Sequence, residues 1–209
     1  MPAPPLTNLV RPDTTALVLQ EVQEGVVGAS SSLPALAEAG ARIGMVPNIA
    51  RLAAAARTAG VPVLHATAEN LPGGFGLNRN ARLFAGARKA GAANAPDSSS
   101  VRPLPEVLGA GDHVLPRYHG LSPLTGSPLD SLLRNQGVTT IVVVGVSLNV
   151  AIPNLVFDAV NRSYQVVLVT DAVAGVPEGY AEHIIGNTLS LLATLVTTDE
   201  LVAAWSSPG

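Results

Sequence analysis

The stretch Ile141-Val-Val-Val-Gly145 is a continuous, strongly β-branched run, and Val-Ser-Leu-Asn-Val-Ala151 follows it directly. A run that is apolar at every position, rather than at alternate positions, is typical of a strand buried on both faces of a parallel sheet. The residues after it read as a turn and the start of a helix that runs to Arg162. The stretch therefore predicts a central strand that leads into a helix.

Other runs along the chain complete the same pattern. Proline weakens His113–Pro116 to an edge strand, because proline has no N–H for the ladder. Strands are predicted over Ala16–Gln20, Val61–His65, His113–Pro116, Gln165–Val169 and Thr194–Thr197. Helices are predicted between them, over residues 46–59, 129–135, 150–162 and 180–192. The alternation predicts a three-layer α/β/α sandwich around a mainly parallel, Rossmann-like sheet of about six strands.

The domain organisation is simple. Residues 1–13 are expected to be an N-terminal extension, and residues 14–209 a single domain. Residues 90–105, which are rich in Ala, Ser, Asn and Pro, are predicted to form a surface loop. Pro72-Gly-Gly-Phe-Gly76 is predicted to be a turn, because it lacks the spacing of a nucleotide-binding glycine loop.

Composition narrows the function classes. The 209 residues carry a formal net charge of −3 and no cysteine, which excludes disulfides, thiolate metal sites and cysteine nucleophiles within this chain. The charge gives no electrostatic footprint for nucleic acid, and no apolar run reaches the roughly 18 residues that cross a bilayer. Without a signal-peptide pattern, we expect a cytoplasmic protein whose partner is a small molecule. Because only 13% of residues are charged, we expect a homo-oligomer, a dimer or larger.

Ligands of such sheets bind outside the carboxyl ends of the strands. Glu21 and Arg117 follow two of the predicted strands, and His119 lies beside Arg117. Ser147 and Asn149 lie in the turn before the 150–162 helix, where backbone N–H groups and the helix dipole suit an anion. Each has a plainer interpretation, as a solvated acid, a structural ion pair or a helix cap.

Other polar residues are weaker candidates. His65 and Glu69 follow the second strand, but they lack the paired histidines of a zinc site, so we expect no metal and no cofactor. His113 and His183 are expected to be structural or solvated. Asp171 is expected to be a turn or cap residue.

Taken together, four segments resemble the isochorismatase-like hydrolase superfamily, also called the cysteine hydrolase family. The resemblance extends from about Thr14 to Trp205. The segments that carry it are Thr15-Ala-Leu-Val-Leu-Gln-Glu-Val-Gln23, Arg117-Tyr-His-Gly-Leu-Ser-Pro123, Gly145-Val-Ser-Leu-Asn-Val-Ala-Ile152 and Asp171-Ala-Val-Ala-Gly175.

The resemblance implies an Asp–Lys–Cys triad, and all three positions differ in this chain. Glu21 stands for the aspartate, Arg117 for the lysine and Ala151 for the cysteine. Arginine keeps the charge but cannot act as a base, and alanine removes the nucleophile. A hydrolytic mechanism through a thioester intermediate is therefore excluded. The zinc motif of some members, Asp-x-His, is not matched by His65–Glu69.

One branch of the family, the isochorismatases that lack the cysteine, hydrolyses a vinyl ether after an acid protonates the substrate. Glu21 could supply that acid, with Arg117 holding an anionic substrate. A nearby arginine favours the ionised carboxylate and burial favours the protonated one, so the sequence leaves the balance open. Two hypotheses remain: a hydrolase that uses Glu21 for acid/base chemistry, and a catalytically silent member that serves as a binding or oligomeric module.

Overall fold

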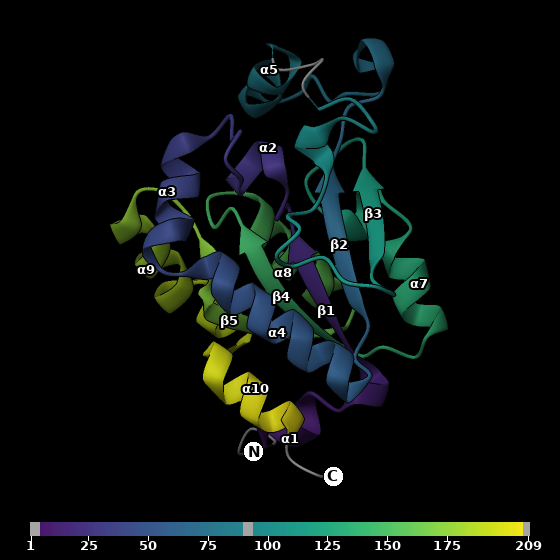
Figure 1. The fold of residues 1–209 in the computed structure, drawn as a ribbon, viewed down its shortest axis with the longest axis vertical. Helices are drawn as coiled ribbons and strands as arrows, with labels where there is room; N and C mark the ends of the chain where they lie inside the picture. Colours follow the sequence, from purple (N-terminus) through teal and green to yellow (C-terminus); the bar gives the residue numbers. More distant parts are fainter. Residues whose placement is uncertain (1–4, 90–93, 207–209) are drawn as a thin grey trace.

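Six parallel strands form the central sheet of the computed structural model, which describes residues 5–89 and 94–206 (Figure 1). Their order is β3-β2-β1-β4-β5-β6. The strands are β1 Thr15–Gln20, β2 Val63–Ala68, β3 His113–Arg117, β4 Thr140–Val146, β5 Gln165–Ala174 and β6 Thr194–Val196. The three-layer α/β/α fold predicted from the apolar runs is confirmed.

Helices cover both faces of this sheet. They are α1 Leu6–Leu9, α2 Glu24–Val27, α3 Pro34–Arg42, α4 Met45–Ala59, α5 Arg82–Lys89, α6 Pro123–Gly126, α7 Leu129–Asn135, α8 Ala151–Asn161, α9 Glu178–Asn187 and α10 Thr198–Ser206. The helix predicted over residues 180–192 ends earlier, and a 3₁₀ turn follows at Leu189–Leu191. Helix α4 ends as predicted, because Gly60 takes a left-handed φ of 78° and bonds the last carbonyls.

Two apolar clusters flank the sheet, as the continuous runs require. Leu17 and Leu19 of β1 pack on the α4 and α10 side, and Ala16 and Val18 pack on the α8 side. Figure 1 shows α4 and α10 in front of the sheet and α8 behind it. Strand β1 is therefore buried on both faces, and its side chains are free of water until the chain leaves the sheet at Glu21.

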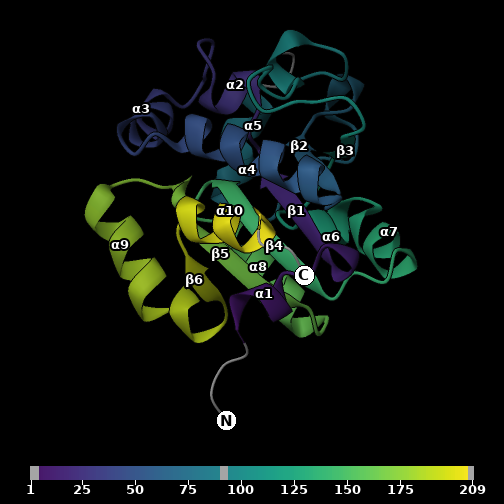
Figure 2. The ribbon, with the colours of Figure 1, turned by 60° about the horizontal axis from the view of Figure 1, so that its bottom comes forward.

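Both ends of the described chain meet at the amino edge of the sheet. The indole Nε1 of Trp205 donates to the Val10 carbonyl at 3.0 Å, and Figure 2 shows α1 beside α10. Residues 1–4 of the expected extension lie outside the described residues. None of the described helices is long and apolar enough to cross a membrane.

The expected surface loop at residues 90–105 is wrong in part. Residues 90–93 lie outside the described residues, but Val101 and Leu104 are buried in or beside the core. A bridge between Gln23 and Pro103 holds this segment against the start of α2. Val101 and Leu104 are isolated apolar residues among polar ones in the sequence, and their side chains are the ones that pack into the protein. Pro72–Gly74 is a 3₁₀ turn, so the turn predicted there is confirmed.

Candidate active site

A cavity of about 480 Å³ opens at the carboxyl ends of the strands, the end that faces α2, α3 and α5 in Figure 1. Glu21, Arg117, Ser147 and Ala151 all line it, together with His119. The parallel topology explains the convergence, because every strand delivers its last residue to the same edge. Five of the six residues selected from the sequence therefore share one cavity.

Glu21 is held firmly where β1 ends. Its N–H donates to the Ala66 carbonyl at 2.9 Å, and its φ of 54° is in the left-handed region that non-glycine residues seldom adopt. Its Oε1 accepts hydrogen bonds from Gln20 Nε2 at 2.9 Å and Arg117 Nη2 at 2.6 Å. Its Oε2 has no partner among the side chains that the structure describes, those of residues 5–85 and 94–206. One carboxylate oxygen is thus fixed and the other is left for a ligand.

The approach of β4 to β1 requires a glycine. Gly145 has a φ of 107°, and a Cβ there would lie 2.9 Å from Val22 Cγ2 and closer still to the Gln20 carbonyl oxygen. The absence of a side chain lets Gly145 lie directly beside Gln20, its partner on the neighbouring strand and the residue that precedes Glu21. This close approach sets the distance between Glu21 and the turn that follows β4.

Arg117 ends β3, and its side chain is only 9% exposed. Beside its bond to Glu21, its Nη1 donates to the carbonyl oxygens of Gly120 and, at 3.5 Å, His119. Gly126 makes room for it, since a Cβ there would lie 2.7 Å from Arg117 Cγ. The guanidinium therefore orients Glu21 and the following loop at the same time.

The turn after β4 contributes Ser147 and the first residue of α8, Ala151, to the cavity wall. The Val146–Ser147 peptide bond is cis. Asn149 is committed elsewhere: its Oδ1 accepts from the Val176 N–H at 2.9 Å and its Nδ2 donates to the Val176 carbonyl. Asn149 thus ties the turn to the segment before α9, while Val150 and Ala151 line the cavity.

Among the polar residues of the cavity that the sequence analysis did not name as ligand-binding residues, three lie together after β2 and β3: Glu69, Asn70 and Tyr118. Burial raises the pKa of Glu69, the negative charge of Asp97 adds to this, and a hydrogen bond from Thr67 Oγ1 at 3.0 Å opposes it. Position was the signal that could have found them, because they directly follow β2 and β3.

His65 does not join Glu69, because it lies within β2, while Glu69 follows the end of that strand four residues later, and a strand rises about 3.3 Å per residue. Its Nε2 lies 2.8 Å from Asp112 Oδ2, which also accepts from Arg57. Burial lowers the pKa of His65. Although burial alone would raise it, hydrogen bonds from Arg57 and His65 bring the pKa of Asp112 down to about 2. No cluster of metal-binding side chains occurs in the described part of the chain.

Asp171 is a cap, as predicted. Its Oδ1 accepts from the Thr198 N–H at 2.8 Å and from the Thr198 hydroxyl at 2.9 Å. The carboxylate thereby satisfies the first turn of α10 and lies outside the cavity wall described above.

Comparison with known proteins gives one consistent result. Residues 15–200 match the isochorismatase domain. A curated relative, the ureidoacrylate amidohydrolase RutB of Methylobacterium radiotolerans, is 30% identical over 82% of this chain and 71% of its own length. A cysteine hydrolase from Pseudomonas syringae pv. phaseolicola shares the fold with a TM-score of 0.81 and 22% identity, covering 94% of each chain. An isochorismatase family protein from Desulfovibrio vulgaris has a TM-score of 0.76 and 27% identity, covering 93% of this chain and 99% of its own.

Proposed function

The chain belongs to the isochorismatase family, and from that premise we propose that it hydrolyses a small molecule without a covalent intermediate, using Glu21 for the proton transfer. The observation that carries the proposal is the unshared Oε2 of Glu21 at the cavity, beside an Oε1 fixed by Gln20 and Arg117. A carboxylate that is oriented on one oxygen and open on the other suits proton transfer.

Water is the nucleophile in this proposal. Ala151 stands where the family places its cysteine, and the chain contains no cysteine at all. The amidohydrolase activity in the name of the Methylobacterium relative is therefore not carried over to this chain as a thioester mechanism. Arg117 donates to Oε1 at 2.6 Å and leaves Oε2 open as an acceptor, so we assign Glu21 the role of base toward the attacking water.

Arg117 and the Ser147–Ala151 turn would bind the rest of the substrate. Ser147 lines the cavity at the amino end of α8, where the helix dipole favours negative charge. An anionic group of the substrate would bind there, sharing the positive charge of Arg117 with Glu21. His119, on the exposed side of the cavity, would contact the ligand from the mouth, and Asn149 would hold the turn in place.

A thermal-shift screen with small carboxylates, amides and enol ethers, followed by turnover assays of each stabilising compound, tests the proposal. On a compound that turns over, Glu21→Gln should lower kcat by about 100-fold or more with ligand affinity broadly intact. Arg117→Ala is the matched change on the partner, and it should first weaken the binding of anionic compounds. Unchanged kcat in Glu21→Gln would remove Glu21 from the mechanism.

A catalytically silent binding module is the second candidate. The observation that favours it is the enclosure of Arg117, which bonds Glu21 and two loop carbonyls and so closes one side of the site. In such a module, Glu21→Gln and Arg117→Ala would change ligand affinity or stability, and no compound of the screen would turn over.

We also propose a cytoplasmic homo-oligomer. Only 13% of the residues are charged, which leaves little polar material to cover the surface, and Phe75 and Leu191 are 78% and 80% exposed. Sedimentation velocity should show a dimer or larger species, and a monomer at tens of micromolar would contradict this.

A further inference from the structure

The charges that line the cavity do not cancel. Glu21 and Arg117 form an ion pair at 2.6 Å, which leaves Glu69 as the remaining carboxylate of the wall. Its only side-chain hydrogen bond comes from the Thr67 hydroxyl, and no Lys, Arg or His of the described residues pairs with it. Asp97, which lies outside the cavity wall, adds negative charge beside it.

This carboxylate is partly withdrawn from water, and the side chains described around it supply no counter-charge. Burial and Asp97 together raise the pKa of Glu69, which means that its surroundings in the protein disfavour the ionised form. A bound cation would reverse both effects. Carboxylates of this kind are stabilised either by a proton or by a positive group of a ligand.

The neighbouring residue supplies an independent sign of a ligand. Asn70 lines the same wall and is only 6% exposed, yet its Nδ2 has no hydrogen-bond partner among the described residues. Buried polar side chains are nearly always satisfied, and this amide nitrogen, itself shielded from water, would gain a partner if the side chain turned toward polar atoms of a ligand in the cavity.

The backbone of this wall is fixed, which keeps both side chains in place. The Glu69 N–H donates to the Arg117 carbonyl at 3.0 Å, and the Asn70 N–H donates to the Asn94 carbonyl at 2.7 Å. Apolar side chains from two helices and their flanks complete the cavity: Leu33, Leu36, Leu83 and Phe84. The cavity is therefore polar at the strand ends and apolar elsewhere, which suits a ligand with a small apolar body.

We infer that the wall formed by Glu69, Asn70 and Tyr118 is a subsite for a cationic group, an ammonium or amidinium, carried on a small apolar body. The inference rests on the proposed function only for making that molecule a substrate; as binding, it concerns the cavity alone. Glu69 would pair with the cation, and the Asn70 amide would supply a second polar contact. With an anionic group at Arg117, the substrate would be a zwitterion.

Three probes of nearly equal size and different charge test this: benzamidine, benzamide and benzoate, titrated by calorimetry at pH 8. The wild-type protein should bind benzamidine about tenfold or more tightly than benzamide, the scale of one charge-assisted hydrogen bond. Glu69→Gln should abolish that preference and leave benzamide binding unchanged, which also shows that the variant is folded. Asp97→Asn is the matched control: it removes a nearby acid outside the wall and should keep the preference.

Acidification provides a second readout that needs no variant. Benzamidine keeps its charge between pH 8 and pH 5, so its affinity should fall as Glu69 gains a proton, while that of benzamide stays level. The other titratable groups near Glu69 or at the cavity are Glu21, Asp97, Tyr118 and His119. A fall in affinity that persists in Asp97→Asn, moved to lower pH because that variant lacks the charge that helps to raise the pKa of Glu69, and that is lost in Glu69→Gln, assigns the effect to Glu69.

The outcomes separate this inference from the proposed function. Equal affinity for benzamidine and benzamide, no benzamidine binding at all, or an equal loss in Asp97→Asn and Glu69→Gln would overturn the cation subsite. None of these depends on turnover. Conversely, a silent protein that shows the charge preference would retain the subsite and lose only the catalytic role of Glu21.

Discussion

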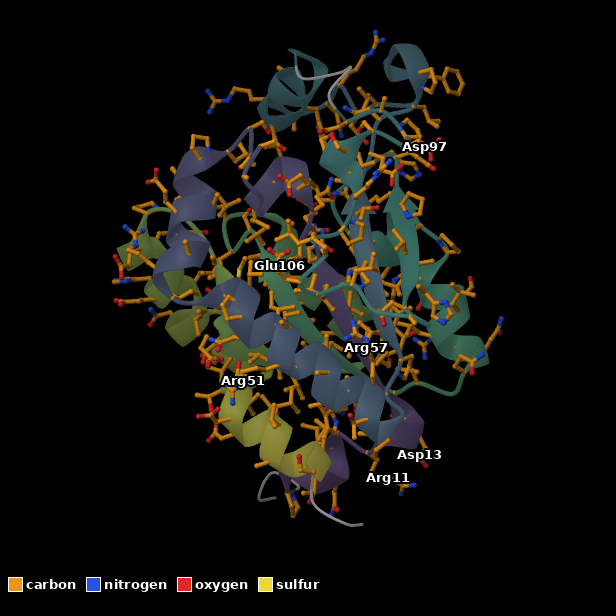
Figure 3. All side chains as sticks on the ribbon, in the orientation of Figure 1. Arg11, Asp13, Arg51, Arg57, Asp97 and Glu106 are labelled. Atoms are coloured by element: carbon orange, nitrogen blue, oxygen red, sulfur yellow. The ribbon has the colours of Figure 1, made fainter. Side chains whose placement is uncertain are left out.

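Two arginine–carboxylate ion pairs lie on this sheet, and they differ in which partner is the more buried. In the pair on the α4 face, Asp112 is 2% exposed and Arg57 is 31% exposed. In the pair at the cavity, the arginine is the more buried partner, with Arg117 at 9% and Glu21 at 18%. Figure 3 shows Arg57 on α4 alongside the sheet, and Asp97 in the loops beyond the carboxyl ends of the strands.

The hydrogen bonds of the two acids explain the difference. Asp112 uses both oxygens: Oδ1 accepts from Arg57 Nε, and Oδ2 accepts from Arg57 Nη2 and the Gly109 N–H and lies 2.8 Å from His65 Nε2. Among the side chains that the structure describes, Glu21 is bonded only through Oε1. A carboxylate that is saturated with donors is structural, whereas one that keeps an oxygen at a cavity is available for chemistry. The same residue types thus serve two purposes. Whether both carboxylate oxygens have hydrogen-bond donors distinguishes the structural pair from the pair at the cavity.

The largest effect is expected where the acid is saturated. Asp112→Asn places an amide nitrogen among donors that need an acceptor, so it should lower the free energy of unfolding by at least about 3 kcal/mol. Glu21→Gln can keep both bonds on its oxygen and turn its nitrogen to the cavity, so it should cost less than about 1 kcal/mol. Urea denaturation of the two isosteric variants measures the difference, and equal losses would break the comparison.

Lowering the pH should destabilise the protein through the same hydrogen-bond network around Asp112. Because the pKa of Asp112 is about 2 in the folded protein and 3.8 ordinarily, the unfolded chain binds its proton first as the pH falls. The stabilisation, about 2 kcal/mol, is complete above pH 4 and is lost toward pH 2. The lowered pKa of His65 acts in the same direction, beginning below its ordinary value of 6.5.

Denaturation curves at pH 7, 5, 4 and 3 measure this loss. The wild-type protein should lose more stability over the series than Asp112→Asn, in which the acid no longer titrates. Parallel losses in the two proteins would assign acid sensitivity to other carboxylates, such as Asp158, whose pKa is also lowered by its hydrogen-bond donors despite its burial.

A glycine lies against each arginine and gives a third, smaller test. A Cβ on Gly109 would lie 2.5 Å from Arg57 Nε. A Cβ on Gly126 would lie 2.6 Å from the His119 carbonyl oxygen and 2.7 Å from Arg117 Cγ. Gly109→Ala should cost about 1–3 kcal/mol of stability, because it pushes Arg57 from Asp112. It should leave benzoate binding unchanged. Gly126→Ala should weaken benzoate binding, and the reverse pattern would show that the pairs are not separate.

Much of this could be predicted from the sequence, because the fold is recorded in local patterns. Runs such as Ile141–Gly145 are apolar at every position, which only a strand covered on both faces requires. Since parallel strands end at one edge, Glu21 and Arg117 could be expected to meet, and they do. The short helices α2 and α6 lack a periodic apolar pattern of sufficient length, so tertiary contacts decide them.

The parts that were not predicted depend on long-range packing. Asp112 and Arg57 are 55 positions apart, and no local pattern joins them. Asn149 was selected for its place in a turn, but its amide bonds Val176, 27 positions further along the chain. The cavity wall of Glu69, Asn70 and Tyr118 follows two strand ends, yet burial without a counter-charge becomes visible only once the neighbouring loops are placed.

The smallest effect on stability, and the most direct test of which position faces the cavity, comes from introducing a thiol. Ala151→Cys adds one sulfur at the first residue of α8, where Ala151 lines the cavity, so it should change stability by less than about 1 kcal/mol. The helix amino end and Arg117 both favour a thiolate, so iodoacetamide should alkylate it rapidly.

Val156→Cys on the same helix is the matched control, because Val156 is fully buried and its thiol should react only on unfolding. The wild-type chain has no cysteine, so intact mass spectrometry reports each introduced thiol alone. Benzoate should slow the reaction in Ala151→Cys if it occupies the site beside Arg117. Equal labelling rates of the two variants would show that the amino end of α8 is no more accessible to the reagent than its middle. Ala151 would then be a structural residue, as Asp112 is, and not part of a ligand site.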